Sequence, residues 1–467
     1  MIIGDWYLTL PSKLESLAPL SISYAAFLLA AFFLCRIFSA RLRPLILIIA
    51  NCFFLYSFSF EHLKYALILS GIGYLCSVLI KRYQRKEILY LSILLYIGIL
   101  SYLKLPELFQ HDHLLPLGIS FYTFKILSYL IDLFRNTTEG TYNPLYYFSY
   151  VLFFPCITAG PIHRFDGFYQ VIRSTQTFDY KDAKNGGFRV ILGIYEKIVF
   201  CDYIASISEK AMSADLSGWN TLLGILLYSF AIYLDFDSYS NIALGSARLL
   251  GFRLEENFQT PYLAKSLKDF WRRWHISLSS FFRDYLYIPL GGNRKGKLIQ
   301  YRNLLIIFAV SGIWHGFAWH YLLWGLLHGL LLIIEDVLFG KLLKKNSILL
   351  TLIGIPVTFT VVSFLWLPFR MENMAEVLAV LKRLSIAQSF SYEAIGMTLN
   401  EAYWLLAVTV IVILCDLLRY RRNLIDDYSR LYFPLRWIGY AVLVITFLIF
   451  GMYGGSFEAS DFIYQFF

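Results

Sequence analysis

The chain has 467 residues, of which 58% are hydrophobic and only 16% are charged. Soluble domains carry about 25% charged residues, so the composition excludes an ordinary soluble protein and indicates a polytopic membrane protein. The formal charge of +9 does not indicate nucleic-acid binding, because the basic residues stand in short loops between apolar segments, where they orient a chain in the membrane.

The first quarter of the chain alternates apolar runs with loops of different charge. Met1–Glu15 is short and amphipathic, which is typical of an interfacial helix. The loops after the first and third apolar runs are rich in Arg and Lys, and the loop after the second is nearly neutral. Because basic loops stay on the cytoplasmic side, we expect an extracytoplasmic N-terminus. The expected spans lie near 18–35, 44–60, 65–80 and 88–104.

The middle of the chain mixes spans with segments that cannot cross a membrane alone. Pro116–Phe134 predicts a span that holds Lys125 and Asp132, for which a local charge pair or snorkelling is the simplest explanation. Phe148–Pro161 is short and rich in Pro and Gly, which predicts a re-entrant or broken helix. Phe165–Lys184 is polar and predicts a loop. Further spans are expected near 188–206 and 219–235.

Two carboxylates, Asp235 and Asp237, close the second of these runs. Residues at i and i+2 point apart on a helix. The spacing therefore argues against a catalytic dyad and favours capping or bonding to the basic stretch Lys265–Lys297 that follows.

A basic stretch, Lys265–Lys297, carries eight Lys or Arg against two Asp. As a helix it would pair Asp269 with Arg273 at i, i+4 and place Trp271 and Trp274 on one apolar stripe. This pattern predicts an amphipathic helix at the cytoplasmic interface. It could anchor the protein to anionic lipid or bind an anionic donor such as the phosphates of coenzyme A, and charge alone leaves both open.

Three histidines follow in Ser311–Gly329, SGIWHGFAWHYLLWGLLHG. Both flanks are basic, so we expect the chain to enter and leave on the cytoplasmic side. The excursion from Tyr301 to Gly340 is barely long enough for two passes of roughly 20 residues each. His315 would then lie about 20 Å deep in a helix, and an ionisable residue at such depth indicates function. A neutral histidine bonded to a backbone carbonyl would also fit.

The histidine spacing does not favour a metal. His315 and His320 are five residues apart with no Glu between them, unlike the i, i+4 pair of HExxH. His320 and His328 are two helical turns apart, too far to share an ion unaided. We therefore expect no metal site.

The last third returns to alternating spans. We expect Leu349–Pro368 to run outward, Arg370–Glu401 to form an amphipathic outer segment, and Tyr403–Leu418 to return to the basic residues around Arg421. Trp437–Met452 then leads to an extracytoplasmic tail, Gly454–Phe467. The sequence as a whole predicts a single all-α membrane domain over residues 1–467, with 11 to 13 membrane segments, some of them re-entrant, and no internal repeat.

Six motifs together resemble the membrane-bound O-acyltransferase (MBOAT) family over most of residues 115–340. They stand in the family's order: PLGISFYTF, FFPCITAGPIHRF, DFDSYSNIALGSARLLGF, NFQTPY, DFWRRWHISLSSFFRDYLYIPLGGNRKG and SGIWHGFAWHYLLWGLLHG. The PLGGNRKG element looks most like the bacterial branch that contains the alginate O-acetylation proteins. The branch that transfers D-alanine to teichoic acids is a close relative.

The resemblance implies a bundle with a central tunnel, in which acyl groups leave a cytoplasmic thioester and end on hydroxyls outside. His315 matches the family's catalytic histidine in WHG, and His275 matches the second motif histidine in RWHISLS. Donor binding is expected at Arg272, Arg273, Trp274, Asn241 and Trp314. The expected donor is acetyl-coenzyme A, with an acyl or D-alanyl carrier protein as the alternative, and no bound cofactor is expected.

The tail FIYQFF resembles the aromatic C-terminal motif whose tyrosine is thought to accept the acyl group in these bacterial systems, here Tyr464. The family pattern has Phe directly after the tyrosine, whereas this chain has Gln465. An interfacial aromatic anchor would also account for the cluster.

The chemistry fits these residues. A thioester is already activated, so the main need is a base for the attacking hydroxyl, and an imidazole with a pKa near about 6.5 suits this at neutral pH. Trp314 and Trp319 would exclude water from His315, and Asn241, Ser277 or Tyr285 could orient a histidine or bind the donor carbonyl.

We therefore expect an acyltransferase in the cell membrane that serves O-acylation of a cell-surface polysaccharide. Its expected partner is an extracytoplasmic transferase of the SGNH-hydrolase type. A transporter without covalent chemistry is the alternative from another class, because intramembrane histidines and carboxylates serve transport as well.

Overall fold

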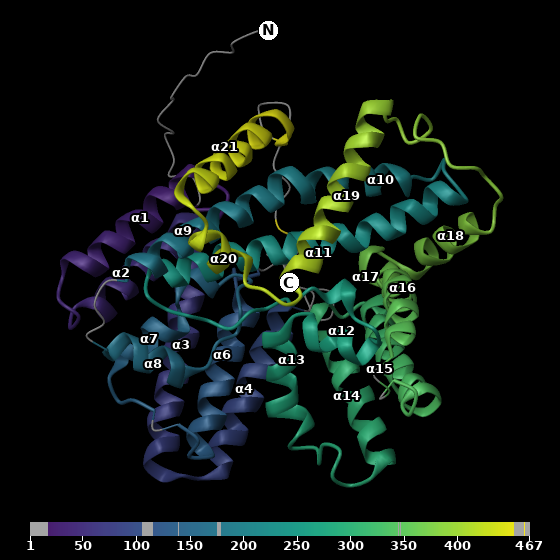
Figure 1. Cartoon of the computed structure of the whole chain (residues 1–467). Coiled ribbons are helices and arrows are strands. Elements are labelled where there is room, and N and C mark those ends of the chain that lie inside the picture. Colours follow the sequence, from purple (N-terminus) through teal and green to yellow (C-terminus); the bar gives the residue numbers. More distant parts are fainter. Residues whose placement is uncertain are drawn as a thin grey trace.

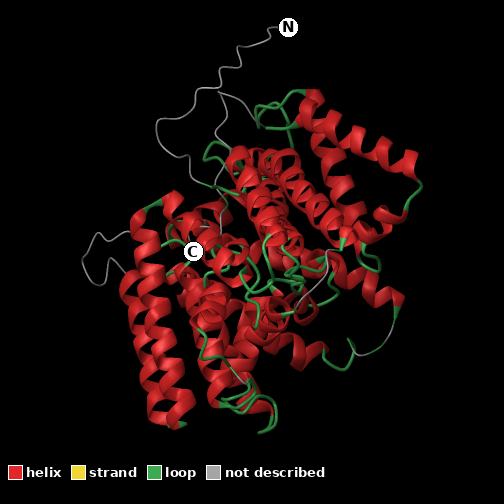
Figure 2. Ribbon diagram, turned by 90° about the vertical axis from the view of Figure 1, so that its left-hand side faces the viewer, coloured by secondary structure: helices red, strands yellow, loops and turns green. Residues whose placement is uncertain are grey.

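Long apolar helices dominate the computed structural model, which describes residues 17–104, 115–138, 140–174, 179–343, 345, 347–452 and 462. All regular structure in these ranges is helical, as Figure 2 shows. Seven of the described helices are long and apolar enough to cross a membrane, and two shorter apolar helices precede them. The chain is therefore an all-α, multi-pass membrane protein, as predicted. The larger predicted count of 11 to 13 segments also included short and broken ones.

The N-terminal helices match the prediction to within a few residues. They are α1 (Ile22–Ile37), α2 (Arg43–Phe58), α3 (Phe60–Tyr83) and α4 (Lys86–Lys104). The next span, α6 (Ile119–Phe134), packs against α3 and α4. The predicted broken segment is confirmed, because α7 (Pro144–Val151) ends before the single turn η1 (Phe154–Cys156).

Lys125 and Asp132 of α6 are not paired with each other, so the predicted local charge pair was wrong. Snorkelling is excluded for Lys125 as well, because its side chain is buried. The buried Lys125 places Nζ 3.5 Å from the carbonyl oxygen of Val151. Asp132 instead accepts a hydrogen bond of 2.6 Å from the hydroxyl of Tyr285. Each group thus finds a partner from another segment, which a pattern within one helix cannot show.

A long helical hairpin crosses the molecule (Figure 1). Its first arm runs without a break through α9 (Tyr180–Tyr195), the π-helical turn η2 (Glu196–Cys201) and α10 (Asp202–Ala211). Its second arm is the 31-residue α11 (Trp219–Leu249). The predicted loop over 165–184 was wrong, because α8 (Phe165–Arg173) and the start of α9 occupy most of it.

Glycines allow the two arms of the hairpin to approach closely. A Cβ atom added at Gly193 of α9 would lie 2.6 Å from the carbonyl oxygen of Ser238 in α11, and one added at Gly245 would lie 2.7 Å from that of Gly186. These distances are shorter than real contacts, so only glycine fits where the backbones meet.

Asp235 and Asp237 lie in the middle of α11 rather than at its end, because the helix continues to Leu249. As expected for i, i+2 positions, they take different partners. Asp235 pairs with Lys197 at 2.7 Å, and Asp237 pairs with Arg419 at 2.6 Å. The prediction of bonding to the basic stretch Lys265–Lys297 was wrong, because the partners are Lys197 of η2 and Arg419 in the C-terminal third of the chain.

The C-terminal half contains a second hairpin, α14 (Lys297–His315) and α15 (Trp319–Phe339), at the lower right of Figure 1. Before it come three short elements, η3 (Pro261–Leu263), α12 (Leu267–Arg273) and α13 (Ile276–Phe282), and the π-helical turn η4 (Arg283–Tyr287). After it come α16 (Ile348–Leu365), α17 (Leu367–Arg370), α18 (Met374–Leu384), α19 (Leu399–Arg419), α20 (Leu424–Arg430) and α21 (Phe433–Phe450).

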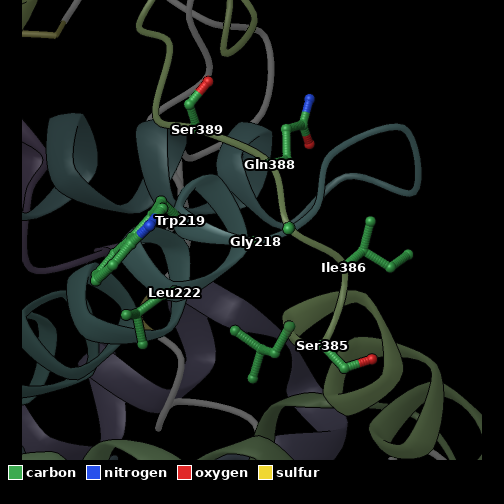
Figure 3. Close-up of a pocket in the computed structure, with 9 residues that line it drawn as sticks. Gly218, Trp219, Leu222, Ser385, Ile386, Gln388 and Ser389 are labelled. Carbon is green, nitrogen blue, oxygen red and sulfur yellow. The ribbon is translucent and has the colours of Figure 1, made fainter.

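A shallow hollow of about 630 Å³ marks the point where the segment after α18 meets the start of α11 (Figure 3). Gly218 has φ +58°, and a Cβ there would lie 2.5 Å from the carbonyl oxygen of Gln388. Trp219 donates its backbone N–H to that same oxygen at 3.2 Å. None of the predicted site residues lines this hollow.

Candidate active site

His315 is the last residue of α14, and Gly316 follows as the C-cap. A Cβ atom at Gly312 would overlap the carbonyl oxygen of Tyr321, and one at Gly325 would overlap that of Phe308. These glycines let α14 and α15 pack backbone to backbone at the turn. The helices have 19 and 21 residues, about 28 and 31 Å. Because α15 but not α14 is among the seven described helices long and apolar enough to cross a membrane, the round trip stays a prediction.

Aromatic rings enclose the imidazole of His315, which is only 5% exposed. Its ring centroid lies 4.5 Å from that of Trp314, 5.2 Å from Trp324 and 5.0 Å from Phe369. Such burial keeps bulk water from the ring. The neighbour Trp319 is 79% exposed, so its predicted role in shielding His315 was wrong, because the helix turn directs it away.

His275 lies at a break in the basic stretch. It adopts a left-handed backbone conformation with φ +44° between α12 and α13, and Trp274 before it is extended and buried. The predicted continuous amphipathic helix was therefore wrong, although the Asp269–Arg273 pair forms at 3.0 Å. A non-glycine residue at positive φ is strained and needs support from its surroundings.

Asn257 provides that support, and the sequence analysis did not assign it a role. The amide Oδ1 of Asn257 lies 3.1 Å from Nδ1 of His275. Because an amide oxygen only accepts, Nδ1 carries the proton, and Nε2 is the ring atom left to act as a base. The predicted orienting residue Ser277 donates to the same Oδ1 at 2.9 Å. Its hydroxyl thus contacts Asn257 rather than the imidazole.

Both histidines border one cluster of tryptophans. Trp366 lies between Trp274 and Trp324, with centroid distances of 4.9 and 5.8 Å. His315 packs edge-on against Trp324, and His275 follows Trp274 directly. The two histidines, 40 positions apart in the sequence, thus adjoin the same aromatic packing. His315 contacts Trp324, and His275 contacts Phe258, whose ring centroid lies 5.0 Å from that of Trp274.

The other two histidines of the WHG stretch make packing contacts. His320 donates from Nδ1 to the carbonyl oxygen of Pro368 at 2.8 Å. His328 accepts at Nδ1 from the indole N–H of Trp271 at 3.3 Å. Each histidine therefore ties α15 to a neighbouring element.

A crevice of about 820 Å³ lies between the α9–α11 hairpin and the C-terminal helices α19, α20 and α21. Arg189, Arg273, Arg419, Arg421 and Arg422 line it, together with Glu196, Glu256 and Asp416. Its inner wall includes Phe258, whose ring centroid is 6.5 Å from that of His275.

Two of the five predicted donor-binding residues line this crevice. Asn241 accepts from Nε of Arg189 at 3.1 Å and donates to Glu196 at 3.0 Å. Arg273 donates to the hydroxyl of Tyr420 at 3.3 Å. Hydrogen bonds thus hold these polar groups in place at the crevice wall.

The other predicted donor-binding residues lie elsewhere. Trp274 and Trp314 are buried in aromatic packing, and Arg272 is exposed on α12. Tyr285, which the sequence suggested as an orienting residue, donates to Asp132. These positions do not line the crevice, because the chain changes direction at His275, between α12 and α13.

Tyr464 lies outside the described residues, but Phe462, two positions earlier, is described. It is only 2% exposed. Its ring packs edge-on against Tyr239 of α11 at 5.1 Å, and Nζ of Lys197 lies 5.0 Å from its centroid. At residue 462 the tail is therefore packed against the long hairpin, beside the buried Lys197–Asp235 pair.

Comparison with known proteins agrees with this arrangement. A family model described as MBOAT, membrane-bound O-acyltransferase family, matches residues 89–348. The chain belongs to this family. The match includes α4, the long hairpin, His275 and the α14–α15 hairpin that carries His315.

The chain is also similar to individual proteins whose names describe acyl transfer. The chain is 41% identical over 264 residues to the protein named "Probable alginate O-acetylase AlgI" from Pseudomonas syringae pv. tomato, which covers 56% of this chain and 50% of the relative. It is 32% identical to the peptidoglycan O-acetyltransferase of Helicobacter pylori, over 72% of each chain. It is also 32% identical to the teichoic acid D-alanyltransferase of Bacillus subtilis, over 54% of this chain and 68% of the relative. The matched region spans about half the length of the alginate O-acetylases.

Proposed function

We propose that this MBOAT protein is an acyltransferase that moves an acyl group, with acetyl as the preferred case, from a cytoplasmic thioester toward a hydroxyl of a cell-surface polysaccharide. The observation that carries the proposal is His315, a buried imidazole held at the tip of a helical hairpin in a family defined by O-acyl transfer. Family membership also favours transfer over the transporter alternative.

His315 acts as the general base in this proposal. It removes the proton from the attacking hydroxyl, which then adds to the thioester carbonyl carbon, and the thiolate leaves and takes up a proton. The aromatic enclosure limits competing hydrolysis of the thioester. His275, fixed by Asn257 in the tautomer whose acceptor nitrogen is Nε2, would assist on the other side of the tryptophan cluster.

The basic crevice is the proposed donor site. Coenzyme A and a carrier-bound phosphopantetheine both carry phosphate, which guanidinium groups bind well. Arg421 and Arg422 stand at the crevice without a hydrogen bond or ion pair to any described residue. The crevice reaches Phe258 beside His275, so a donor anchored at the arginines would extend its thioester toward the histidines.

The acceptor side follows from the direction of the helices. We place the start of α14, near Lys297, in the cytoplasm because its flank is positively charged, and we place the turn after His315 toward the outside. Both chain termini are extracytoplasmic in this proposal. The acyl group would pass to Tyr464 and then to an extracytoplasmic transferase of the SGNH-hydrolase type. The described residue Phe462, two positions before Tyr464, is buried against Tyr239 of α11, and this contact supports the proposed hand-over.

Coenzyme A release from acetyl-coenzyme A by the purified protein tests the base. We expect His315→Gln to lower turnover by at least about 100-fold, the lower end of what a general base contributes. His320→Gln is the matched control, because glutamine can still donate to the carbonyl of Pro368. Equal turnover in wild type and His315→Gln would refute the assignment.

D-alanine transfer from a carrier protein is the second candidate. The similarity to a teichoic acid D-alanyltransferase favours it, and the same base and crevice would serve. A D-alanyl carrier that is consumed in a His315-dependent reaction, while acetyl-coenzyme A is left intact, would decide for this candidate.

A further inference from the structure

Two helices that are far apart in the sequence meet at the candidate base. α4 and α14 each have 19 residues and each begin at a lysine, Lys86 and Lys297. At the other end of α4, Nζ of Lys104 donates to the carbonyl oxygen of Trp314 at 2.5 Å. The same ammonium lies 5.0 Å from the centroid of the Trp314 ring. A lysine 210 residues away thus contacts both the backbone and the ring of the residue before His315.

The contact has a clear physical effect on α14. The last four carbonyls of a helix have no partner within it, and cations are favoured at this negative end. Lysine side chains can bond these carbonyls. Trp314 is in the last turn of α14, so Lys104 caps that turn from outside the helix. A lysine that only snorkelled to lipid headgroups would point away from the protein.

Lys104 is also linked to the imidazole of His315 through the indole ring of Trp314, which contacts both groups. The Trp314 ring lies between Phe124 of α6, at 5.5 Å, and His315, at 4.5 Å. An ammonium in apolar surroundings is costly unless it is bonded. The bond to the Trp314 carbonyl oxygen therefore holds both the Lys104 side chain and the last turn of α14 in place.

We propose that Lys104 is a positioning residue that fixes the last turn of α14 and thereby the orientation of His315 for acyl transfer. The proposal rests on the function proposed above for its kinetic consequence, but its structural part does not. Without the ammonium, the last turn would lose its cap, and the imidazole would sample orientations that do not reach the hydroxyl.

Steady-state kinetics with Lys104→Met test the kinetic part. We expect kcat to fall about 10- to 100-fold, the effect of a displacement of about 1 Å at a reacting group, with the donor KM changed less than about twofold. Lys104→Arg should recover most of kcat, because a guanidinium can donate to the same carbonyl. Lys86→Met, at the other end of α4, is the matched control and should behave as wild type.

A double variant separates positioning from general destabilisation. In a His315→Gln background, Lys104→Met should cause no further loss of turnover, because Lys104 acts through His315. An additional loss there, or a normal kcat in Lys104→Met alone, would overturn the proposal. An equal loss in Lys86→Met would overturn it too.

Hydrogen exchange measured by mass spectrometry tests the structural part without any activity. Backbone amides of the last turn of α14 should exchange faster in Lys104→Met than in wild type or Lys86→Met. Unchanged exchange would overturn the capping role even if the protein is an acyltransferase. If the wild-type protein consumes no thioester donor but exchange in Lys104→Met is faster as expected, the proposed function is refuted and the capping role of Lys104 is retained.

Discussion

At the scale of single residues, the structure gives the two motif histidines different supports. His315 is held by rings and by the end of its helix, whereas His275 is held by a hydrogen bond to Asn257. An orienting partner of this kind sets which ring nitrogen is free to react. A single substitution at Asn257 would therefore remove the hydrogen bond that orients His275.

Asn257→Leu should lower acyl transfer about as much as His275→Gln does, by about 10- to 100-fold, the range seen when orienting partners of functional histidines are removed. The physical reason is that the leucine cannot accept from Nδ1. Turnover of the two variants would be compared under the same conditions. Asn257→Asp keeps an acceptor and Ser277→Ala keeps the Asn257–His275 bond, so both should retain activity. A fully active Asn257→Leu would show that the bond is only structural.

The sequence could predict the burial of His315 from the basic flanks and the apolar run, but it could not predict Asn257 or Lys104. Asn257 reaches His275 only because the chain turns back at the left-handed residue between α12 and α13. Lys104 ends an apolar run like an ordinary interfacial lysine, and its partner is 210 residues away. Both roles depend on tertiary contacts, which a periodic pattern in the sequence does not reveal.

At the scale of elements, the α14–α15 hairpin depends on glycine at its crossing. A Cβ at Gly325 would overlap the carbonyl oxygen of Phe308, and backbone atoms cannot move aside easily.

Gly325→Ala should therefore destabilise the protein by about 1–3 kcal/mol, the usual range for an overpacked site. Thermal unfolding in detergent would measure the change. Gly98→Ala in α4 is the control, since nothing lies within 4 Å of the added Cβ, and it should leave the midpoint unchanged or raise it slightly. A normal midpoint for Gly325→Ala would mean that the helices are less tightly packed than described.

The long hairpin contains a buried ion-pair cluster on which its stability depends. Nζ of Lys197 lies 2.7 Å from Asp235 and 2.9 Å from Asp202, and all three side chains are 1% exposed. Lys197→Met leaves two buried carboxylates without their cation, which should cost about 3–5 kcal/mol. Lys64→Met, which breaks the exposed pair with Glu61, should have little effect on thermal unfolding. Similar midpoints for the two variants would contradict this difference.

Element boundaries followed the sequence pattern best in α1–α4 and worst around α8–α11 and α12–α13. Apolar runs with basic ends mark a span clearly. Polar stretches such as 165–173 and 180–184 also form helices here because neighbouring helices bury one face of them. The break at His275 follows from tertiary packing that overrides helical periodicity.

At the scale of the whole molecule, charge predicts the orientation in the membrane. The loop between α3 and α4 is basic, so we expect it in the cytoplasm, and we expect the segment after α18 outside.

Cysteine labelling in intact cells tests this orientation. In a background without the six native cysteines, Ala387→Cys should react with a membrane-impermeant maleimide in intact cells. Arg85→Cys should react only after permeabilisation, because its loop faces the cytoplasm. The reverse pattern would invert the proposed route from donor to acceptor.

The family and the all-helical class could be predicted from six ordered motifs and the composition, because both are properties of sequence alone. The crevice could not, because its lining comes from six α-helices, the π-helical turn η2 and the loop residues between them. Its arginines look like ordinary orientation charges in the sequence, and only their placement beside Phe258 suggests a donor site.

Mass spectrometry of the purified chain after incubation with acetyl-coenzyme A tests the central claim most directly. Isotope-labelled acetyl should appear on the C-terminal peptide that carries Tyr464 in wild type and in His320→Gln, and should be absent in His315→Gln. Label that persists in His315→Gln, or a wild-type chain that neither takes up label nor consumes any thioester donor, would contradict His315-dependent acyl transfer.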